Sequence, residues 1–425
     1  MPHSLYVHIP FCRHRCAYCD FNTYARQERE IPAYVAAVCQ EATYVGARAP
    51  DDLILHTIFF GGGTPSLLSP AQIGAILRSV YDAFTVTAAA ETTLEANPGT
   101  VSLAGLQLLR QEGINRLSLG VQSANAEELR LLERQHSYGD VLDAVVAARR
   151  AGFENLNLDL IYGLPEQTLG TWQNTLKRIL DLRPEHVSAY ALTLEHGTPF
   201  GAWARRGLLP LPDPDLAADM YEWASSELET AGYSQYEISN WAIVGHECRH
   251  NLQYWRGLPY LGLGAGGHGY SSGYRYSNVL DIRAYIDRLS NTMPSRIAFG
   301  PPAGHGQSRP GNPRSTTSPF PLSPAVATRH RQSTGEDIAE FMIMGLRLTR
   351  EGIALSTFRD RFDGELKAVF GREIQELRAL GLVDLVRGVE DPGVTPAKPP
   401  HLGEVLRLSK RGRLLGNQVF KRFVN

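Results

Sequence analysis

Three cysteines lie close together near the N-terminus of this 425-residue chain: Cys12, Cys16 and Cys19. They form a C-x3-C-x2-C motif directly after the apolar run LYVHI, which predicts the first strand. Three thiolates are one fewer than the four ligands of a closed structural zinc site. An iron–sulfur cubane held by three cysteines instead keeps one iron open to a further ligand. The motif therefore favours an iron–sulfur centre with an open coordination position.

Spacing alone leaves two alternatives for these cysteines. A zinc site completed by His8 or His14 is one, and three simple buried thiols are the other. The two remaining cysteines, Cys39 and Cys248, are interpreted as plain thiols. Five cysteines, three of them crowded together, do not resemble a secreted disulfide framework, so a reducing compartment is expected.

A run of glycines, Gly61 to Gly63, ends the second predicted strand within the sequence FFGGGTPS. Glycines at such a place let the backbone approach a ligand closely and expose N–H groups. No Gly-Lys-Ser/Thr sequence follows, so the run is not a P-loop. It suits an amino or carboxylate group better than a phosphate.

Polar residues lie at or just beyond the ends of later apolar strands, with an arginine in an intervening helical region. Singly, each is more simply a satisfied barrel residue or a helix cap. Together they predict a polar rim along one edge of a sheet, which suits a ligand with hydroxyl, amine and carboxylate groups. The four residues are Glu95, Gln122, Arg134 and Asp159.

Short apolar runs alternate with amphipathic stretches from residue 4 to about residue 230. The amphipathic stretches have helical spacing, and several end at Gly or Pro. Strand followed by helix, repeated, predicts an α/β domain of parallel strands over residues 1–230. The six predicted strands are residues 5–9, 55–60, 92–96, 116–121, 155–161 and 186–192.

The sequence beyond residue 230 divides into three parts. Residues 231–298 are an extension that contains the segment HNLQYW. Residues 299–335 are rich in Pro, Gly and Ser and carry no acidic residue, which predicts a disordered insertion. Residues 336–425 show short helical patterns followed by a strand or wing, which predicts a small helical, winged-helix-like domain.

The charge balance excludes some partners. Lys and Arg number 42 against 44 Asp and Glu, a formal charge of -2, so no global field attracts nucleic acid. The N-terminus lacks the basic and apolar regions of a secretion signal, and no segment reaches the length of a membrane span. We therefore expect a soluble, cytoplasmic protein that has no nucleic-acid partner.

The cysteine motif with its aromatic Tyr18, the GGGTPS turn and the polar rim resemble the radical SAM superfamily. The resemblance covers residues 4 to about 290 and implies a partial (βα)6 barrel. It implies that Cys12, Cys16 and Cys19 bind a [4Fe-4S] cluster whose fourth iron chelates the amino-acid end of S-adenosylmethionine. The residues implied to contact these cofactors are Tyr6, Tyr18, Gly62, Gly63, Thr64, Glu95, Gln122, Arg134 and Asp159.

Within this superfamily the chain resembles the branch that contains oxygen-independent coproporphyrinogen III oxidase and the HemW-type haem chaperones. The oxidase typically has another cysteine two positions after the third and a longer N-terminal segment. Here Asp20 and Phe21 follow Cys19, and eleven residues precede Cys12. The segment HNLQYW matches the HNxxYW motif of the HemW group. These features favour the HemW side.

His250 opens that motif, and two interpretations stay open for it. A neutral imidazole is a good axial ligand for haem iron, and Tyr254 and Trp255 could stack on a porphyrin face. Alternatively, His250 is a histidine beside aromatic core residues with no role in binding.

Three functions are compatible with these features. The favoured one is a haem chaperone, with haem as cargo and haem-accepting proteins, membrane-associated ones included, as partners. The alternative is an enzyme that oxidatively decarboxylates coproporphyrinogen III in porphyrin biosynthesis by radical chemistry. A zinc-stabilised module is the third, and it leaves the polar rim unexplained.

Overall fold

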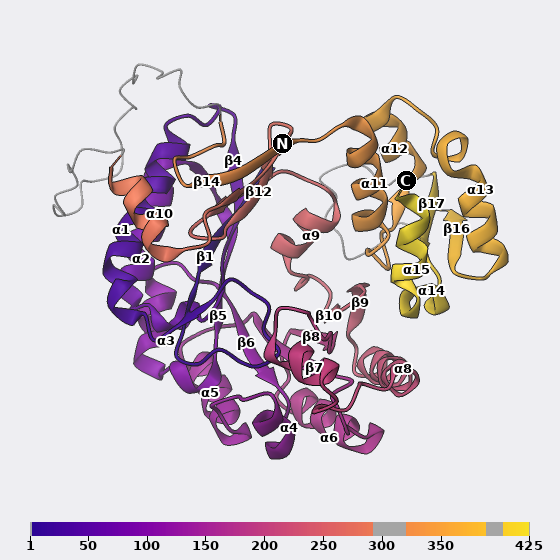
Figure 1. Cartoon of the computed structure of the whole chain (residues 1–425), viewed down its shortest axis with the longest axis horizontal. Coiled ribbons are helices and arrows are strands. Elements are labelled where there is room, and N and C mark those ends of the chain that lie inside the picture. The colour runs from indigo at the N-terminus through magenta and orange to yellow at the C-terminus, as the bar shows by residue number, and fades with distance from the viewer. Residues whose placement is uncertain (1, 292–319, 388–402, 425) are drawn as a thin grey trace.

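The computed structural model describes residues 2–291, 320–387 and 403–424 and shows a large α/β domain beside a smaller C-terminal domain (Figure 1). Within these residues the large domain contains a twelve-stranded sheet, and the small domain a three-stranded sheet. A separate parallel pair, β2 (Phe11–Cys12) and β3 (Tyr24–Ala25), lies at the two ends of the cysteine loop.

Six parallel strands form the centre of the large sheet, at the positions that the apolar runs predict. They are neighbours in the order β1-β4-β5-β6-β7-β8. Both outer edges continue into further strands, so the sheet is open and the predicted partial (βα)6 barrel is confirmed. The strands are β1 (Pro2–Ile9), β4 (Ile54–Gly62), β5 (Thr85–Ala96), β6 (Arg116–Gln122), β7 (Leu156–Tyr162) and β8 (His186–Ala191).

Helices between these strands cover the outer face of the sheet and share one hydrophobic core with it (Figure 1). Capping boxes at Ser69, Ser137 and Thr168 fix where α2, α5 and α6 begin. The helices of the large domain up to residue 230 are α1 (Ile31–Gly46), α2 (Pro70–Ala83), α3 (Leu103–Gln111), α4 (Ala126–Leu131), α5 (Tyr138–Arg150), α6 (Leu169–Leu180), α7 (Pro199–Arg205) and α8 (Pro214–Thr230).

The segment after α8 extends both edges of the same sheet. β9 (Ser234–Glu237) and β10 (Asn240–Ala242) add to the β8 edge, with β10 antiparallel to β8. The chain then crosses through α9 (Arg249–Trp255) to the opposite edge, where β11 (Tyr260–Leu263) pairs in parallel with β1. The elements that follow are β12 (His268–Ser271), β13 (Tyr274–Asn278) and α10 (Ile282–Ser290).

The predicted disordered insertion, residues 299–335, differs from the structure at its C-terminal end. Residues 299–319 lie outside the described residues. Val326–Arg331 forms β14, which pairs antiparallel with β13, so the predicted extent is wrong there. β14 is an edge strand with mostly exposed, polar side chains. It therefore lacks the apolar pattern from which a strand can be predicted.

The C-terminal domain has a winged-helix order of elements, as the sequence predicts. Its core is a separate cluster of buried apolar side chains, among them Phe358, Ile374 and Leu406. The strands pair in the order β15-β17-β16. The elements are α11 (Thr334–Gly345), β15 (Ile353–Ala354), α12 (Leu355–Phe362), α13 (Leu366–Ala379), β16 (Val383–Arg387), β17 (Glu404–Leu408), α14 (Lys410–Leu414) and α15 (Gly416–Phe420).

The two domains contact each other through β9, α9 and β13 of the large domain and through α11 and the residues around Thr349 of the small domain. Arg275 on β13 forms an ion pair with Glu340 on α11, and Arg256 after α9 pairs with Glu351. Within the residues described, no helix has both the length and the apolar character needed to cross a bilayer.

Candidate functional site

The cysteine loop lies at the carboxyl end of β1, the end where barrels of parallel strands carry their chemistry. Cys12 is buried, Cys16 and Cys19 are half-buried, and all three are free thiols. The loop turns sharply, because the Cys19 N–H donates to the Cys16 carbonyl oxygen at 3.1 Å. Burial, as the main cause, raises the pKa of the Cys12 and Cys19 thiols. A metal bound there must therefore displace protons.

The glycine turn at the end of β4 packs against this loop. Thr64 donates from its backbone N–H to the Phe11 carbonyl oxygen at 2.8 Å, and from its hydroxyl to the Cys12 Sγ at 3.7 Å. A Cβ on Gly63 would lie 2.6 Å from the Phe11 carbonyl oxygen and 3.0 Å from the Cys12 Sγ. Gly62 has a φ of 116°, which disfavours any other residue. The close approach of turn and loop thus depends on glycine.

Arg134 connects the cysteine loop to the end of β6. Its guanidinium donates to the Cys16 Sγ at 3.8 Å, to the Asn97 Oδ1 at 2.5 Å and to the Gly120 carbonyl oxygen at 2.6 Å. Asn97 in turn donates to the Thr64 hydroxyl at 3.1 Å. Thr64, Asn97 and Arg134 therefore form a chain of hydrogen bonds from Cys12 to Cys16.

Glu95 on β5 and Asp159 on β7 place two carboxyl groups on either side of β6. Glu95 accepts a hydrogen bond from the Gly62 N–H at 3.0 Å. Burial first, and then the negative charge of Asp159, raise the pKa of Glu95 to about 7. Asp159 accepts hydrogen bonds from Ser118 and Asn157, each at 2.8 Å. Two carboxyl groups therefore lie close enough to interact, in different hydrogen-bonding surroundings.

Gln122 and Tyr18 complete the predicted set around Arg134. Gln122 ends β6 with a left-handed φ of 69°. A Cβ on Gly120 would lie 3.0 Å from the Gln122 Nε2 and 3.2 Å from the Arg134 Nη2, so both side chains converge there. Burial raises the pKa of the Tyr18 hydroxyl, which interacts with Arg134 and Cys16.

Tyr6 lies on β1 beside the glycine turn. Its hydroxyl is 3.0 Å from the His8 Nδ1, and a Cβ on Gly61 would lie 2.9 Å from its ring. The structure therefore brings the predicted cofactor-binding residues into one region around the cysteine loop and the strand ends. The His250 ring lies at the margin of this region, with its centroid 6.4 Å from that of Tyr6.

These residues fit an iron–sulfur cluster with an organic cofactor beside it. The Cys12 and Cys16 sulfur atoms accept hydrogen bonds from Thr64 and Arg134, an interaction that stabilises a thiolate and tunes a bound cluster. The Nε of Arg134 is buried and has no hydrogen-bond partner among the described residues. In the part of the chain that the structure describes, no three His, Cys, Asp or Glu side chains are grouped closely enough to hold a single metal ion.

Sequence reasoning missed three polar residues of the site: Asn97, Ser118 and Asn157. Asn97 and Asn157 are each two positions from a predicted residue, Glu95 and Asp159. Side chains two apart on a strand point to the same face, so this spacing could have found Asn157 on β7.

The expectation that His250 contacts haem is not supported by its surroundings. His250 is 1% exposed, and its two ring nitrogens are 2.7 Å from the Thr57 Oγ1 and 2.8 Å from the Tyr254 hydroxyl. Burial lowers the pKa of His250 to about 3, so the ring is neutral. HNLQYW folds as helix α9, which places Tyr254 one turn after His250 and covers its outer nitrogen. His250 in this structure is a packing residue.

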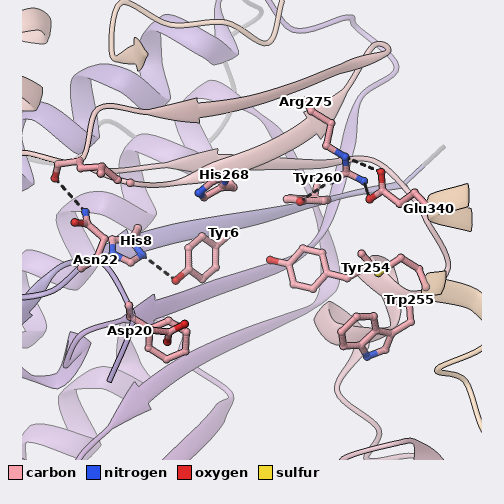
Figure 2. A pocket seen from close by; sticks show the side chains of 14 residues that line it. Tyr6, His8, Asp20, Asn22, Tyr254, Trp255, Tyr260, His268, Arg275 and Glu340 are labelled. Atoms are coloured by element: carbon pink, nitrogen blue, oxygen red, sulfur yellow. Dashed lines mark hydrogen bonds and ion pairs between the residues drawn. The ribbon is translucent and has the colours of Figure 1, made fainter. Parts of the chain in front are cut away.

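A cavity of about 450 Å³ lies beside Tyr6 and His8 of β1. Its walls come from β1, from β11 to β13, from α9 and from α11 of the C-terminal domain. Figure 2 shows Tyr6, Tyr254 and His268 pointing into the same space. Asp20, Phe21 and Asn22, which directly follow Cys19, also line it.

Comparison with known proteins agrees with this architecture. Residues 6–179 match the model of the radical SAM superfamily, and residues 333–388 match the HemN C-terminal domain. The structure is similar to that of coproporphyrinogen III oxidase (HemN) from Escherichia coli, with a TM-score of 0.76 and 25% identity over 99% of this chain and 90% of that one.

Curated relatives are similar over almost the whole chain. A protein from Bacillus subtilis named heme chaperone HemW is 36% identical over 99% of both chains. A protein of the same name from Lactococcus lactis is 33% identical over 100% of this chain and 97% of its own. At this identity and coverage, together with the radical SAM and HemN C-terminal matches, the chain belongs to the HemW family of the radical SAM superfamily.

Proposed function

We propose that this protein is a haem chaperone that binds haem and delivers it to acceptor proteins. In this proposal it carries a [4Fe-4S] cluster on Cys12, Cys16 and Cys19, and S-adenosylmethionine beside the cluster. The carrying observation is the chain of hydrogen bonds from Cys12 through Thr64, Asn97 and Arg134 to Cys16. The names of the curated relatives support haem as the cargo.

The strand ends offer suitable groups for each part of S-adenosylmethionine. Gly62 and Gly63 allow the backbone to approach an amino or carboxylate group. Glu95 and Asp159 offer carboxyl oxygens to ribose hydroxyls, and Tyr6, Tyr18, Gln122 and Arg134 lie around them. When bound, the cluster and this cofactor together supply one-electron chemistry. The protein's own residues bind and orient them.

The zinc alternative lacks a suitable fourth ligand. Both ring nitrogens of His8 are engaged, one with Tyr6 at 3.0 Å and one with the Asn22 carbonyl oxygen at 2.9 Å. The His14 Nε2 pairs with Glu133 at 3.0 Å, at the surface. The five cysteines form no disulfide, which suits a reducing compartment such as the cytoplasm.

The second candidate function is oxidative decarboxylation of coproporphyrinogen III. The similarity to the E. coli oxidase over nearly the whole chain favours it. Against it stands the sequence after Cys19, where Phe21 occupies the position at which that oxidase typically has a further cysteine.

One set of anaerobic measurements tests both candidates. Reconstituted protein is analysed for iron and sulfide, titrated with haem, mixed with an apo-acceptor haem protein, and assayed with coproporphyrinogen III and S-adenosylmethionine under reduction. We expect about four irons per chain, saturable haem binding, transfer of haem to the acceptor, and little decarboxylation. Zinc without sulfide would overturn the cluster, and rapid decarboxylation without haem transfer would overturn the chaperone.

A further inference from the structure

The cavity between the sheet edge and the C-terminal domain has the size and lining of a ligand site. Its volume of about 450 Å³ lies within the range of small-molecule pockets. Tyr6, Tyr254, Trp255 and Tyr260 supply aromatic side chains to its walls (Figure 2). Tyr254 and Tyr260 pack edge to face with ring centroids 4.6 Å apart, which holds both rings in place. Such a wall favours a flat aromatic ligand.

His268 is the one histidine whose ring projects into the middle of this space (Figure 2). It begins β12, where it pairs with Ser277 of β13, and its side chain is exposed to the cavity. Neither of its ring nitrogens forms a hydrogen bond with any part of the chain that the structure describes. His8 also lines the cavity, but Tyr6 and Asn22 occupy both of its nitrogens.

The surroundings of His268 keep its ring neutral. Partial burial first, and then the positive charge of Arg275, lower its pKa below the ordinary value of 6.5. Two carboxylates line the cavity, Asp20 and Glu340. Glu340 forms an ion pair with Arg275 instead of reaching the imidazole (Figure 2). A neutral imidazole with free nitrogens inside an aromatic pocket is the usual arrangement for binding a haem iron.

We propose that this cavity is the haem site and that His268 is an axial ligand of the haem iron. The proposal rests on the chaperone function, and it assigns the iron ligand to a residue outside the motif HNLQYW. That motif supports the site indirectly: His250 fixes Tyr254 through the hydrogen bond at 2.8 Å, and Tyr254 forms part of the wall. Bound there, haem lies beside the residues that follow Cys19 and against α11 of the C-terminal domain.

The test compares the full-length wild type with His268→Ala by haem titration, monitored by absorption and EPR spectroscopy. We expect His268→Ala to lose the imidazole-ligand spectrum and to bind haem at least tenfold more weakly. Added imidazole should restore the spectrum, because it can enter the space that the side chain vacates. His330→Ala is the matched control, since His330 lies exposed on β14 and pairs with Glu336. It should behave as the wild type.

A second measurement places the haem independently of the iron ligand. Trp255 lines the cavity, so bound haem should quench its fluorescence, and Trp255→Phe should remove that part of the quenching. Identical haem spectra in wild type and His268→Ala would overturn the ligand, and quenching unchanged by Trp255→Phe would overturn the site. In either case haem binding by the wild type would leave the chaperone function standing. Failure of the wild type to bind haem would refute the chaperone function itself.

Discussion

The sulfur atoms of Cys12 and Cys16 each accept a hydrogen bond from a different segment, from Thr64 and from Arg134. Hydrogen bonds to sulfur spread the negative charge of a thiolate and so change the reduction potential of a bound cluster. At the scale of single residues, the polar groups that surround the cysteines thus matter as much as the cysteines themselves.

Replacement of one predicted ligand should remove the cluster. We expect Cys16→Ser to hold less than a tenth of the wild-type iron and sulfide after anaerobic reconstitution, because serine is a poor iron ligand. Cys39→Ser is the control, since Cys39 is a buried thiol on α1 and should leave the metal content unchanged. Equal loss of iron in both variants would show that the loss comes from unfolding or that Cys39 is also a ligand.

Glu95 should titrate near neutral pH in the cofactor-free protein, because burial and Asp159 raise its pKa to about 7 from 4.5. Because folding raises the pKa of this carboxyl, its protonated form favours the folded state and its ionised form disfavours it. Its contribution is complete below about pH 4.5 and is lost as the pH rises through about 7. The free energy of unfolding should therefore fall between these values by roughly 3 kcal/mol more in wild type than in Glu95→Gln.

Infrared difference spectroscopy checks the same ionisation directly. A carboxyl band that titrates near pH 7 in wild type should be missing in Glu95→Gln. A band that titrates at the ordinary value for glutamate would contradict the burial that the structure shows.

The end of β4 and the start of the cysteine loop form the tightest junction between elements of the site. The Gly63 N–H donates to the Ile9 carbonyl oxygen at 2.8 Å, and Thr64 bonds to Phe11 two residues further along. At this scale, cluster geometry depends on how closely a turn can approach a loop.

Gly63→Ala should disrupt that junction. The new methyl group would lie 2.6 Å from the Phe11 carbonyl oxygen, so strand or loop must shift, at a cost of about 1 to 3 kcal/mol. We expect lower cluster occupancy and a lower melting temperature. Gly371→Ala on α13 is the control, because a Cβ there meets no atom within 4 Å. Normal iron content in Gly63→Ala would mean that the loop adapts freely.

The large domain and the C-terminal domain meet around the cavity, so whole-molecule motion bears on access to it. Arg275 and Glu340 form a bidentate pair in the wall, with side chains 28% and 21% exposed. Arg256 and Glu351 form a more exposed pair outside it, at 35% and 50%. Separation of the two domains would open the cavity to solvent.

The two ion pairs should differ in their effect on domain contact. Glu340→Gln leaves a partly buried arginine unpaired, so we expect hydrogen exchange on α11 to become faster by the equivalent of about 1 to 3 kcal/mol. Glu351→Gln should change it by less than about 1 kcal/mol, because exposed pairs contribute little. Similar exchange rates in both variants would show that the Arg275–Glu340 pair does not hold α11 in place.

The sequence pattern by itself determined the six parallel strands and the winged-helix-like order of the C-terminal domain, and it identified the cysteine loop and the polar residues at the strand ends. These features are readable because they depend on local spacing: apolar runs define strands, and parallel strands bring their carboxyl ends to one edge. The open barrel came from the resemblance to the radical SAM superfamily. The sequence did not predict β14, because an exposed edge strand needs no apolar pattern.

Only the tertiary structure distinguishes the surroundings of His250 from those of His268. Both lie in the extension beside aromatic and glycine residues, and nothing in their local sequence says which nitrogens stay free. The answer depends on remote partners: Thr57 on β4 reaches His250, whereas β12 turns His268 toward a space enclosed by α9 and α11. Hydrogen-bond partners and cavity walls come from segments far apart in the chain, so burial and free coordination sites arise only on packing.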